Sequence, residues 1–198
     1  MSSHFSNFTI QLSVIVFVAS LQTPHIQSEV TPKSTSRRIR SMYSGIRRSY
    51  TLLVHLLMEI IEELGTDRGI EMLQTAVEKQ ADIIEKELRD RIPPELSPIK
   101  KGIAVYKDFM ESAGAEVTLR EEDDHEATFW VKRCPFYEAL LDVGIDCGYF
   151  LGGLCTHLTL PAIQATLKRF DPRLKLETKI VRESAEELCL ERIYIEKT

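Results

Sequence analysis

Residues 114–131, GAEVTLREEDDHEATFWV, indicate the fold class, because an alternating apolar pattern begins here after a long helical region. In the first part of the stretch, every second residue is apolar, at Ala115, Val117 and Leu119. The acidic residues 121–124 form the expected turn, and residues 127–131 supply a second apolar run. Two alternating runs joined by a polar turn predict a β-hairpin.

Three helices are predicted before the hairpin. The first covers residues 50–64 and ends at Gly65, and we expect it to be a core helix because its apolar residues form one wide stripe. The stripe consists of Leu52, Leu53, Leu56, Leu57, Ile60, Ile61 and Leu64. The second helix runs from residue 66 to about 90, before Pro93-Pro94, and the third starts at the cap residue Ser97 and continues through Met110.

Two further helices and two strands are predicted after the hairpin. Pro135 opens a short helix over 136–143, and a longer helix begins near Asp146, meets Pro161 and ends at Phe170. Alternating residues over 174–181 and 188–195 predict strands. The predicted class is therefore α+β, with N-terminal helices packed against a small antiparallel sheet of about four strands and two further helices.

The 198 residues fit a single domain over 42–198, preceded by a basic, flexible leader over 1–41. The first 50 residues carry six Lys or Arg against Glu29, and the remaining 148 carry 19 bases and 29 acids. The net charge of −10 on the body disfavours nucleic-acid binding. Residues 31–50 are rich in Ser and are expected to be a solvated linker, with contact to phosphate or anionic lipid as the alternative.

The apolar run at residues 12–19 is too short for a transmembrane segment. It resembles the apolar part of a secretory signal, although no basic residue precedes it, and the alternative is that Met42 is the effective start. Four cysteines (Cys134, Cys147, Cys155 and Cys189) lack CxxC spacing, which argues against a zinc ribbon. We expect reduced thiols and a cytoplasmic location, with secretion as the alternative if residues 1–20 act as a signal.

Cys134 is the first candidate catalytic residue, because it lies at a strand end just before a helix start. The positive end of the helix and Arg133 would favour its thiolate, whereas the alternative is a small buried core residue. Glu138 shares a helix face with Cys134 and is a candidate proton carrier, as is His157. Cys155 and His157 lie on different helix faces, so they are not expected to bind one metal together.

The order and spacing of several segments over residues 52–195 resemble the L-2-amino-thiazoline-4-carboxylic acid hydrolase family, and also the 4-vinyl reductase-type small-ligand domains. These segments are 62–65, 133–138, 170–176, Cys155 and Cys189. The resemblance implies hydrolytic opening of a C–N bond in a small cyclic amidine-like thiazoline acid, with Cys134, Cys155 and Cys189 as matched positions. The family's Asp and Gly near the last two cysteines are replaced here by Leu158 and Ala185.

The hydrolase hypothesis gives catalytic roles to Cys134, Cys155, His157 and Glu138, and substrate binding to Arg133, Arg173 and Tyr137. A second hypothesis is a non-enzymatic ligand-binding or sensor module, with an apolar pocket between the sheet and the helix over 146–167. A third is a zinc or iron site drawn from Cys134, Cys155, His157 and Cys189. No cofactor is required by the sequence, and the expected partners are a small molecule and, as a possibility, a second copy of the chain.

Overall fold

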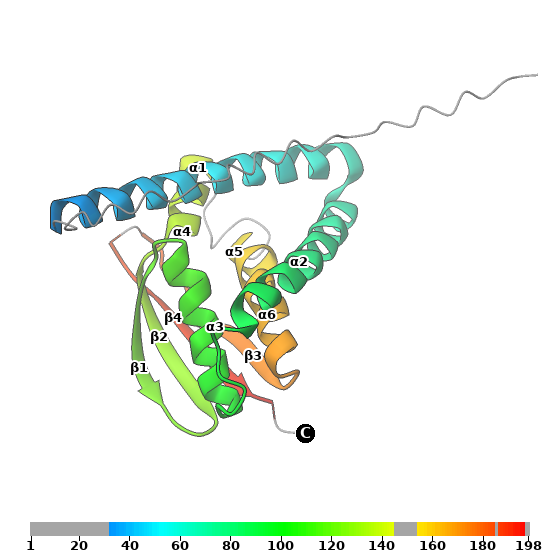
Figure 1. The fold of residues 1–198 in the computed structure, drawn as a ribbon. Coiled ribbons are helices and arrows are strands. Elements are labelled where there is room, and N and C mark those ends of the chain that lie inside the picture. Colours follow the sequence, from blue (N-terminus) through cyan, green and yellow to red (C-terminus); the bar gives the residue numbers. More distant parts are fainter. Residues whose placement is uncertain (1–31, 145–153, 185, 197–198) are drawn as a thin grey trace, which may run out of the picture. The chain divides into compact units, whose positions relative to one another are not determined.

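The computed structural model describes residues 32–144, 154–184 and 186–196, and the predicted α+β class is confirmed (Figure 1). The elements in chain order are α1 (Pro32–Leu64), α2 (Thr66–Arg89), α3 (Pro98–Ser112), β1 (Glu116–Glu122), β2 (Glu126–Arg133), α4 (Pro135–Asp142), α5 (Leu154–His157), α6 (Thr159–Phe170), β3 (Leu174–Ile180) and β4 (Cys189–Ile195). The start of the helix predicted from Asp146 lies outside the described residues.

The four strands form one antiparallel sheet in the order β1-β2-β4-β3. The β1–β2 hairpin is the predicted one, and its turn is stabilised by Asp123, whose Oδ1 accepts the backbone N–H groups of His125 at 2.7 Å and Glu126 at 2.8 Å. β2 and β4 are the central strands, and Phe129 is paired with Glu191. Because β4 lies between β2 and β3, it has no free edge, and some of its residues are buried.

Helix α3 contacts all four strands, and α6 contacts β3. The core between α3 and the sheet is built from fully buried residues, including Tyr106, Phe129 and Ile193. Gly102 allows the close approach, because a Cβ atom at this position would lie 3.1 Å from Ile193 Cγ2 and 3.2 Å from Leu174 Cδ2. The helix therefore packs more tightly on the sheet than an alanine would permit.

Helix α1 packs against α4 and α2, and α2 packs against α6 (Figure 1). The expectation of a solvated linker over 31–50 is wrong for residues 32–50, because α1 begins at Pro32. Two contacts with α4 and its N-terminal flank hold this part of the helix. Arg133 lies over the ring of Tyr43 at 3.7 Å, and Arg47 Nη1 forms an ion pair with Glu138 Oε2 at 2.8 Å. These tertiary contacts therefore stabilise a helix over residues whose local sequence pattern does not predict one.

The leucine stripe of α1 is only partly a core element, which corrects the prediction of a core helix. Val54 and Leu57 are buried, but Leu52 is 70% exposed and Leu56 is 54% exposed. None of the helices in the described part of the chain is both long enough and apolar enough to cross a membrane. The exposed leucines therefore lie on the surface of a helix that is anchored by its other face.

Candidate functional site

Cys134, Cys155 and Cys189 line one small cavity between the sheet and helices α4, α5 and α6. Cys134 immediately precedes α4, Cys155 lies in α5, and Cys189 begins β4. The cavity has a volume of about 30 Å³, and Tyr137 and Glu191 also line it. We call it the thiol cavity. Its volume is comparable to that of a water molecule, so it does not hold a substrate as it stands.

The structure reverses the expectation that Cys134 is held as a thiolate. Cys134 has an extended backbone (φ −139°, ψ 112°), and Pro135 opens α4 directly after it, as predicted. The side chain is buried, and loss of hydration raises the pKa of its thiol to about 12. The backbone N–H groups of Tyr137 and Phe136 lower this pKa, but by less than burial raises it. The thiol is therefore protonated at neutral pH.

Glu191 is a buried carboxyl at the same cavity. It is 7% exposed on the central strand β4, and burial raises its pKa above the ordinary value, against the opposing effects of Tyr106 and Arg182. Tyr106 Oη, from α3, donates a hydrogen bond to Glu191 Oε2 at 2.6 Å. Burial also raises the pKa of Tyr106, whose ring contacts Phe129 with 4.4 Å between centroids. The site therefore contains a carboxyl whose pKa is raised by burial.

Arg182 supplies a buried positive charge beside the thiols. The side chain is buried near the start of the segment that follows β3, and its Nε donates to Cys189 Sγ at 3.3 Å. Its Nη1 donates to the carbonyl oxygen of Lys132 at 2.7 Å, and its Nη2 donates to that of Val131. Arg182 also lies 5.0 Å from the ring centre of Tyr137. The guanidinium thus ties the end of β2 to the start of β4 and orients Cys189.

A larger apolar groove lies on the other side of Thr159, which lines both the groove and the thiol cavity. The groove has a volume of about 450 Å³, within the ~300–1,000 Å³ range of small-molecule sites. Its walls are Ile46, Ser49, Tyr50 and Leu53 of α1 and Leu73, Ala76, Val77 and Gln80 of α2, and its floor is Phe109, Phe136, Leu158, Thr159 and Ala162. Tyr50 and Thr159 are joined by a hydrogen bond between their hydroxyl groups.

Several predicted site residues lie outside the thiol cavity. Glu138 faces α1, where it accepts hydrogen bonds from Tyr43 and Arg47, so the shared helix face with Cys134 does not bring the carboxylate to the thiol cavity. Arg133 stacks on Tyr43 instead of facing the thiols. His157 is half-buried on α5 and is not among the residues that line the cavity.

Arg173 lies at the opposite end of β3 from the cavity residue Thr178. The two residues are five positions apart along the chain, which corresponds to roughly 16 Å of extended strand. The guanidinium is exposed and bonds to Asp171 through Nη2–Oδ2 at 2.8 Å and Nε–Oδ1 at 3.1 Å. Of the three predicted substrate-binding residues, only Tyr137 therefore lines the cavity.

The three cysteines meet, but not as a metal centre. Within residues 32–144, 154–184 and 186–196, no group of three His, Cys, Asp or Glu side chains is arranged to hold a metal ion. Cys147 lies outside the described residues. The cavity contains thiols, a carboxyl and neighbouring hydroxyl groups, which are groups that take part in proton transfer and covalent chemistry.

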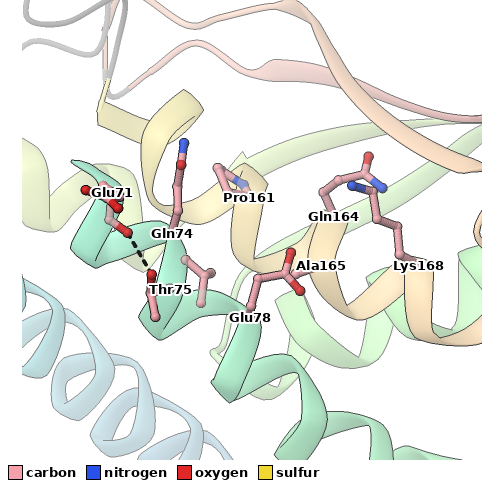
Figure 2. A pocket seen from close by; sticks show the side chains of 9 residues that line it. Glu71, Gln74, Thr75, Glu78, Pro161, Gln164, Ala165 and Lys168 are labelled. Atoms are coloured by element: carbon pink, nitrogen blue, oxygen red, sulfur yellow. Dashed lines mark hydrogen bonds between the residues drawn. The ribbon is translucent and has the colours of Figure 1, made fainter. Parts of the chain in front are cut away.

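A polar hollow of about 410 Å³ lies between α2 and α6 (Figure 2). Figure 2 shows Glu78 of α2 facing the side of α6 that carries Gln164 and Lys168. Three of its polar side chains already have partners: Glu78 pairs with Arg169, Glu71 pairs with Arg68, and Gln164 bonds to backbone atoms of Leu174 and Leu176 at 2.8 and 2.7 Å. We therefore interpret this hollow as a packing seam between helices.

Sequence reasoning missed Glu191, Arg182 and Tyr106. One signal could have found Glu191: β4 alternates, and Cys189, Glu191 and Ile193 have the same parity, so they share one sheet face. A carboxylate at an inward position of a central strand is unusual. Arg182 and Tyr106 carry no comparable local signal, because their roles depend on the order of strands in the sheet.

Comparison of the chain with protein-family models gives no match, and neither does comparison with curated proteins.

Proposed function

We propose that the protein is a small-molecule hydrolase whose reaction takes place at the thiol cavity. The observation that carries the proposal is the burial of Glu191 beside three thiols, because a carboxyl with a raised pKa at a cavity is typical of catalytic sites. A buried ionisable group also costs folding free energy, and such costs are usually retained where function requires them.

The chemistry assigns Glu191 the role of proton carrier. As a carboxylate it accepts the proton of the nucleophile during attack on the amidine-like carbon, and in the neutral form it then donates this proton to the departing nitrogen as the C–N bond breaks. The nucleophile is a water molecule in the cavity or the Cys134 thiol; in the second case a water molecule then attacks the carbon bound to sulfur, and the S–C bond breaks to restore the thiol. With its pKa at about 12, the thiol needs a base at the moment of attack, and Glu191 is the carboxyl at the same cavity. Tyr106 is a positioning residue that orients this carboxyl.

The resemblance stated above supports a small cyclic amidine-like acid as the substrate, with one water consumed for each C–N bond broken. Such a molecule is larger than the thiol cavity, so we place its ring in the apolar groove, with the reacting carbon directed past Thr159 and the charged carboxylate left at the open side of the groove in water, because no charged side chain is among the described lining residues. Tyr50 and Phe136, whose ring centroids are 4.8 Å apart, lie along this route.

The test is to incubate the full chain with L-2-amino-thiazoline-4-carboxylic acid and to follow a product heavier by one water by liquid chromatography and mass spectrometry. We expect Glu191→Gln to lower kcat by about 10²-fold or more, because an amide cannot shuttle the proton. Glu138→Gln is the matched control, because this carboxylate pairs with Arg47 outside the cavity. Absence of turnover by the wild type, or equal activity of both variants, would remove this proposal.

The apolar groove favours a second candidate, a non-enzymatic binding module for a neutral small ligand. No charged side chain is among the groove's lining residues in the described part of the chain, and such a lining suits an uncharged molecule. Titration with the neutral fluorophore N-phenyl-1-naphthylamine should then give one bound molecule per chain. Ala76→Trp fills the groove and should weaken binding by about tenfold or more, whereas Lys79→Trp, on the same helix but outside the lining, should leave it unchanged.

A further inference from the structure

Two of the cysteines at the thiol cavity lie on opposite walls of it. Cys155 belongs to α5 in the helical layer, and Cys189 begins β4 in the sheet. The space between the walls is about 30 Å³, which is comparable to one water molecule. Helix α5 has four residues. The two thiols are therefore separated by a gap that a shift of one helical turn would close.

Cys189 has a positive charge fixed beside its sulfur. Arg182 Nε donates a hydrogen bond to Cys189 Sγ at 3.3 Å, and the carbonyl oxygens of Val131 and Lys132 hold the rest of the guanidinium in place. Such a charge stabilises the negative charge that develops on a sulfur atom when the thiol proton leaves. Cysteines that sense oxidants combine this feature with access to solvent and a second thiol nearby. The half-buried Cys189 has this combination.

Exposure selects Cys155 over Cys134 as the second thiol. Cys155 and Cys189 are both half-buried, whereas Cys134 is buried. Burial also raises the pKa of the Cys134 thiol to about 12, and a thiol that stays protonated attacks another sulfur slowly. An oxidant from solvent therefore has better access to Cys155 and Cys189 than to Cys134.

We propose that Cys155 and Cys189 are a site of reversible oxidation, at which hydrogen peroxide converts the two thiols into a disulfide. The Cys189 sulfur attacks one oxygen of the peroxide, so that an S–O bond forms and the O–O bond breaks. The thiol proton leaves with the second oxygen as water. The sulfur loses two electrons in this step, and the peroxide gains them.

The second step closes the bridge. The Cys155 sulfur attacks the sulfur of the Cys189 sulfenic acid, so that an S–S bond forms and the S–O bond breaks. The hydroxyl group leaves with the Cys155 proton as a second water. Two thiols and one peroxide thus give one disulfide and two waters, and a dithiol reductant reverses the change.

The disulfide would join α5 to β4 across the thiol cavity. It would occupy the space beside Glu191, which lines the same cavity, and would therefore restrict access to this carboxyl. That consequence for turnover rests on the proposed hydrolase function. The disulfide itself does not, because it is detected by mass without any substrate.

The first test treats the reduced wild-type full chain with hydrogen peroxide, blocks the remaining thiols with N-ethylmaleimide and analyses unreduced peptides by mass spectrometry. Chymotrypsin is the suitable protease, because cleavage after Tyr137 and Tyr149 separates Cys134, Cys147 and Cys155. We expect a linked pair of peptides that contains Cys155 and Cys189 and disappears with dithiothreitol. No disulfide, a different pairing, or a bridge between two chains overturns the proposal.

The second test uses variants of the full chain. Cys155→Ser should stop oxidation at the sulfenic acid of Cys189, which dimedone traps, whereas the matched control Cys134→Ser should form the same disulfide as the wild type. A disulfide between Cys189 and Cys134 in Cys155→Ser would overturn the selection of Cys155. Loss of the Cys155–Cys189 disulfide in a folded Cys134→Ser variant would also overturn it.

The third test examines the guanidinium. Arg182→Gln should slow the oxidation of Cys189 by about tenfold or more. Arg173→Gln is the control, because this exposed guanidinium bonds to Asp171 outside the thiol cavity, and the rate should stay unchanged. Equal rates in the two variants would overturn the role of Arg182. If Arg182→Gln does not fold, the pairing found in the wild type decides the proposal.

Discussion

Tyr106 donates a hydrogen bond from its hydroxyl to Oε2 of Glu191 at 2.6 Å, and both residues are buried. The bond joins α3 to the central strand β4 through a carboxyl that has little contact with water. Since the hydroxyl occupies one carboxyl oxygen, the protonation of Glu191 depends on its surroundings within the core rather than on solvent. Because folding raises the pKa of Glu191, the free energy of unfolding depends on pH.

We predict that Glu191 makes the folded state less stable as the pH rises above about 4.5, the ordinary pKa of the carboxyl. The folded state keeps the proton to higher pH than the unfolded chain, because burial raises the pKa. The folded state thus binds more protons in this range, and the free energy of unfolding falls with pH until the folded carboxyl ionises.

The Glu191→Gln variant lacks this pH-dependent contribution to the free energy of unfolding, because its amide does not titrate. The free energy of unfolding of the wild type minus that of the variant, measured by urea denaturation at several pH values, should therefore decline from pH 4.5 upward. The other titrating groups cancel in the difference. A difference that is constant or rises with pH would contradict the assignment of a raised pKa to this carboxyl.

The Cys134 thiol should react slowly in the folded protein. With its pKa at about 12, only about one thiol in 10⁴ is ionised at pH 8, and the side chain is also buried. We expect alkylation of Cys134 by iodoacetamide to be at least tenfold slower than that of the half-buried Cys155, as measured by peptide mass spectrometry. In urea the two rates should become similar. Rapid native labelling of Cys134 would mean that its thiol is ionised and accessible.

The ion pairs of Arg47 should stabilise the packing of α1 on α4. The guanidinium bonds to both Glu138 and Asp142, and it lowers the pKa of Asp142. Because the side chain is 38% exposed, we expect Arg47→Ala to cost only about 1 kcal/mol in the free energy of unfolding. Arg68→Ala is the control, since its pair with Glu71 lies on one helix and is more exposed, and it should cost about 0.3 kcal/mol. Equal losses would show that the α1–α4 pairs add nothing.

Gly102→Ala should destabilise the protein by about 1–2 kcal/mol, because the added methyl group would press on Ile193 and Leu174. Gly45→Ala has the opposite expectation. This position is also inside a helix, but a Cβ atom there meets nothing within 4 Å, so better helix propensity should stabilise the fold by about 0.5–1 kcal/mol. Thermal and urea unfolding of both variants test the pair. A stabilising Gly102→Ala would mean that α3 shifts on the sheet without cost.

Local signals account for the parts of the fold that were predicted. Ser97 caps α3 and accepts the Lys100 N–H at 3.5 Å, and Gly65 adopts a φ of +85° after α1. Each of these features depends on a few neighbouring residues, so it is visible in the sequence. The leucines of α1 show the limit of this reasoning: a period of 3.6 indicates which side chains share a face, but not whether another element covers that face.

The candidate site was only partly predictable for a related reason. Cys134, Cys155 and Cys189 were identified individually, but their meeting at one cavity depends on β4 lying beside β2. Glu138 had the expected helix face, yet α1 provides Arg47 and Tyr43 as its partners. Both results depend on contacts between segments that are far apart in the sequence, and the spacing of residues along the chain does not predict such contacts.

Thr159 is a wall shared by two compartments of very different size. An occupant of the apolar groove would press on the same residue that borders the thiols, so filling one compartment would change access to the other. Cysteine labelling rates could therefore report on groove occupancy by a molecule that touches no sulfur atom. Ligands of the groove could then be screened through the labelling rates of the protein's own cysteines, without an attached dye.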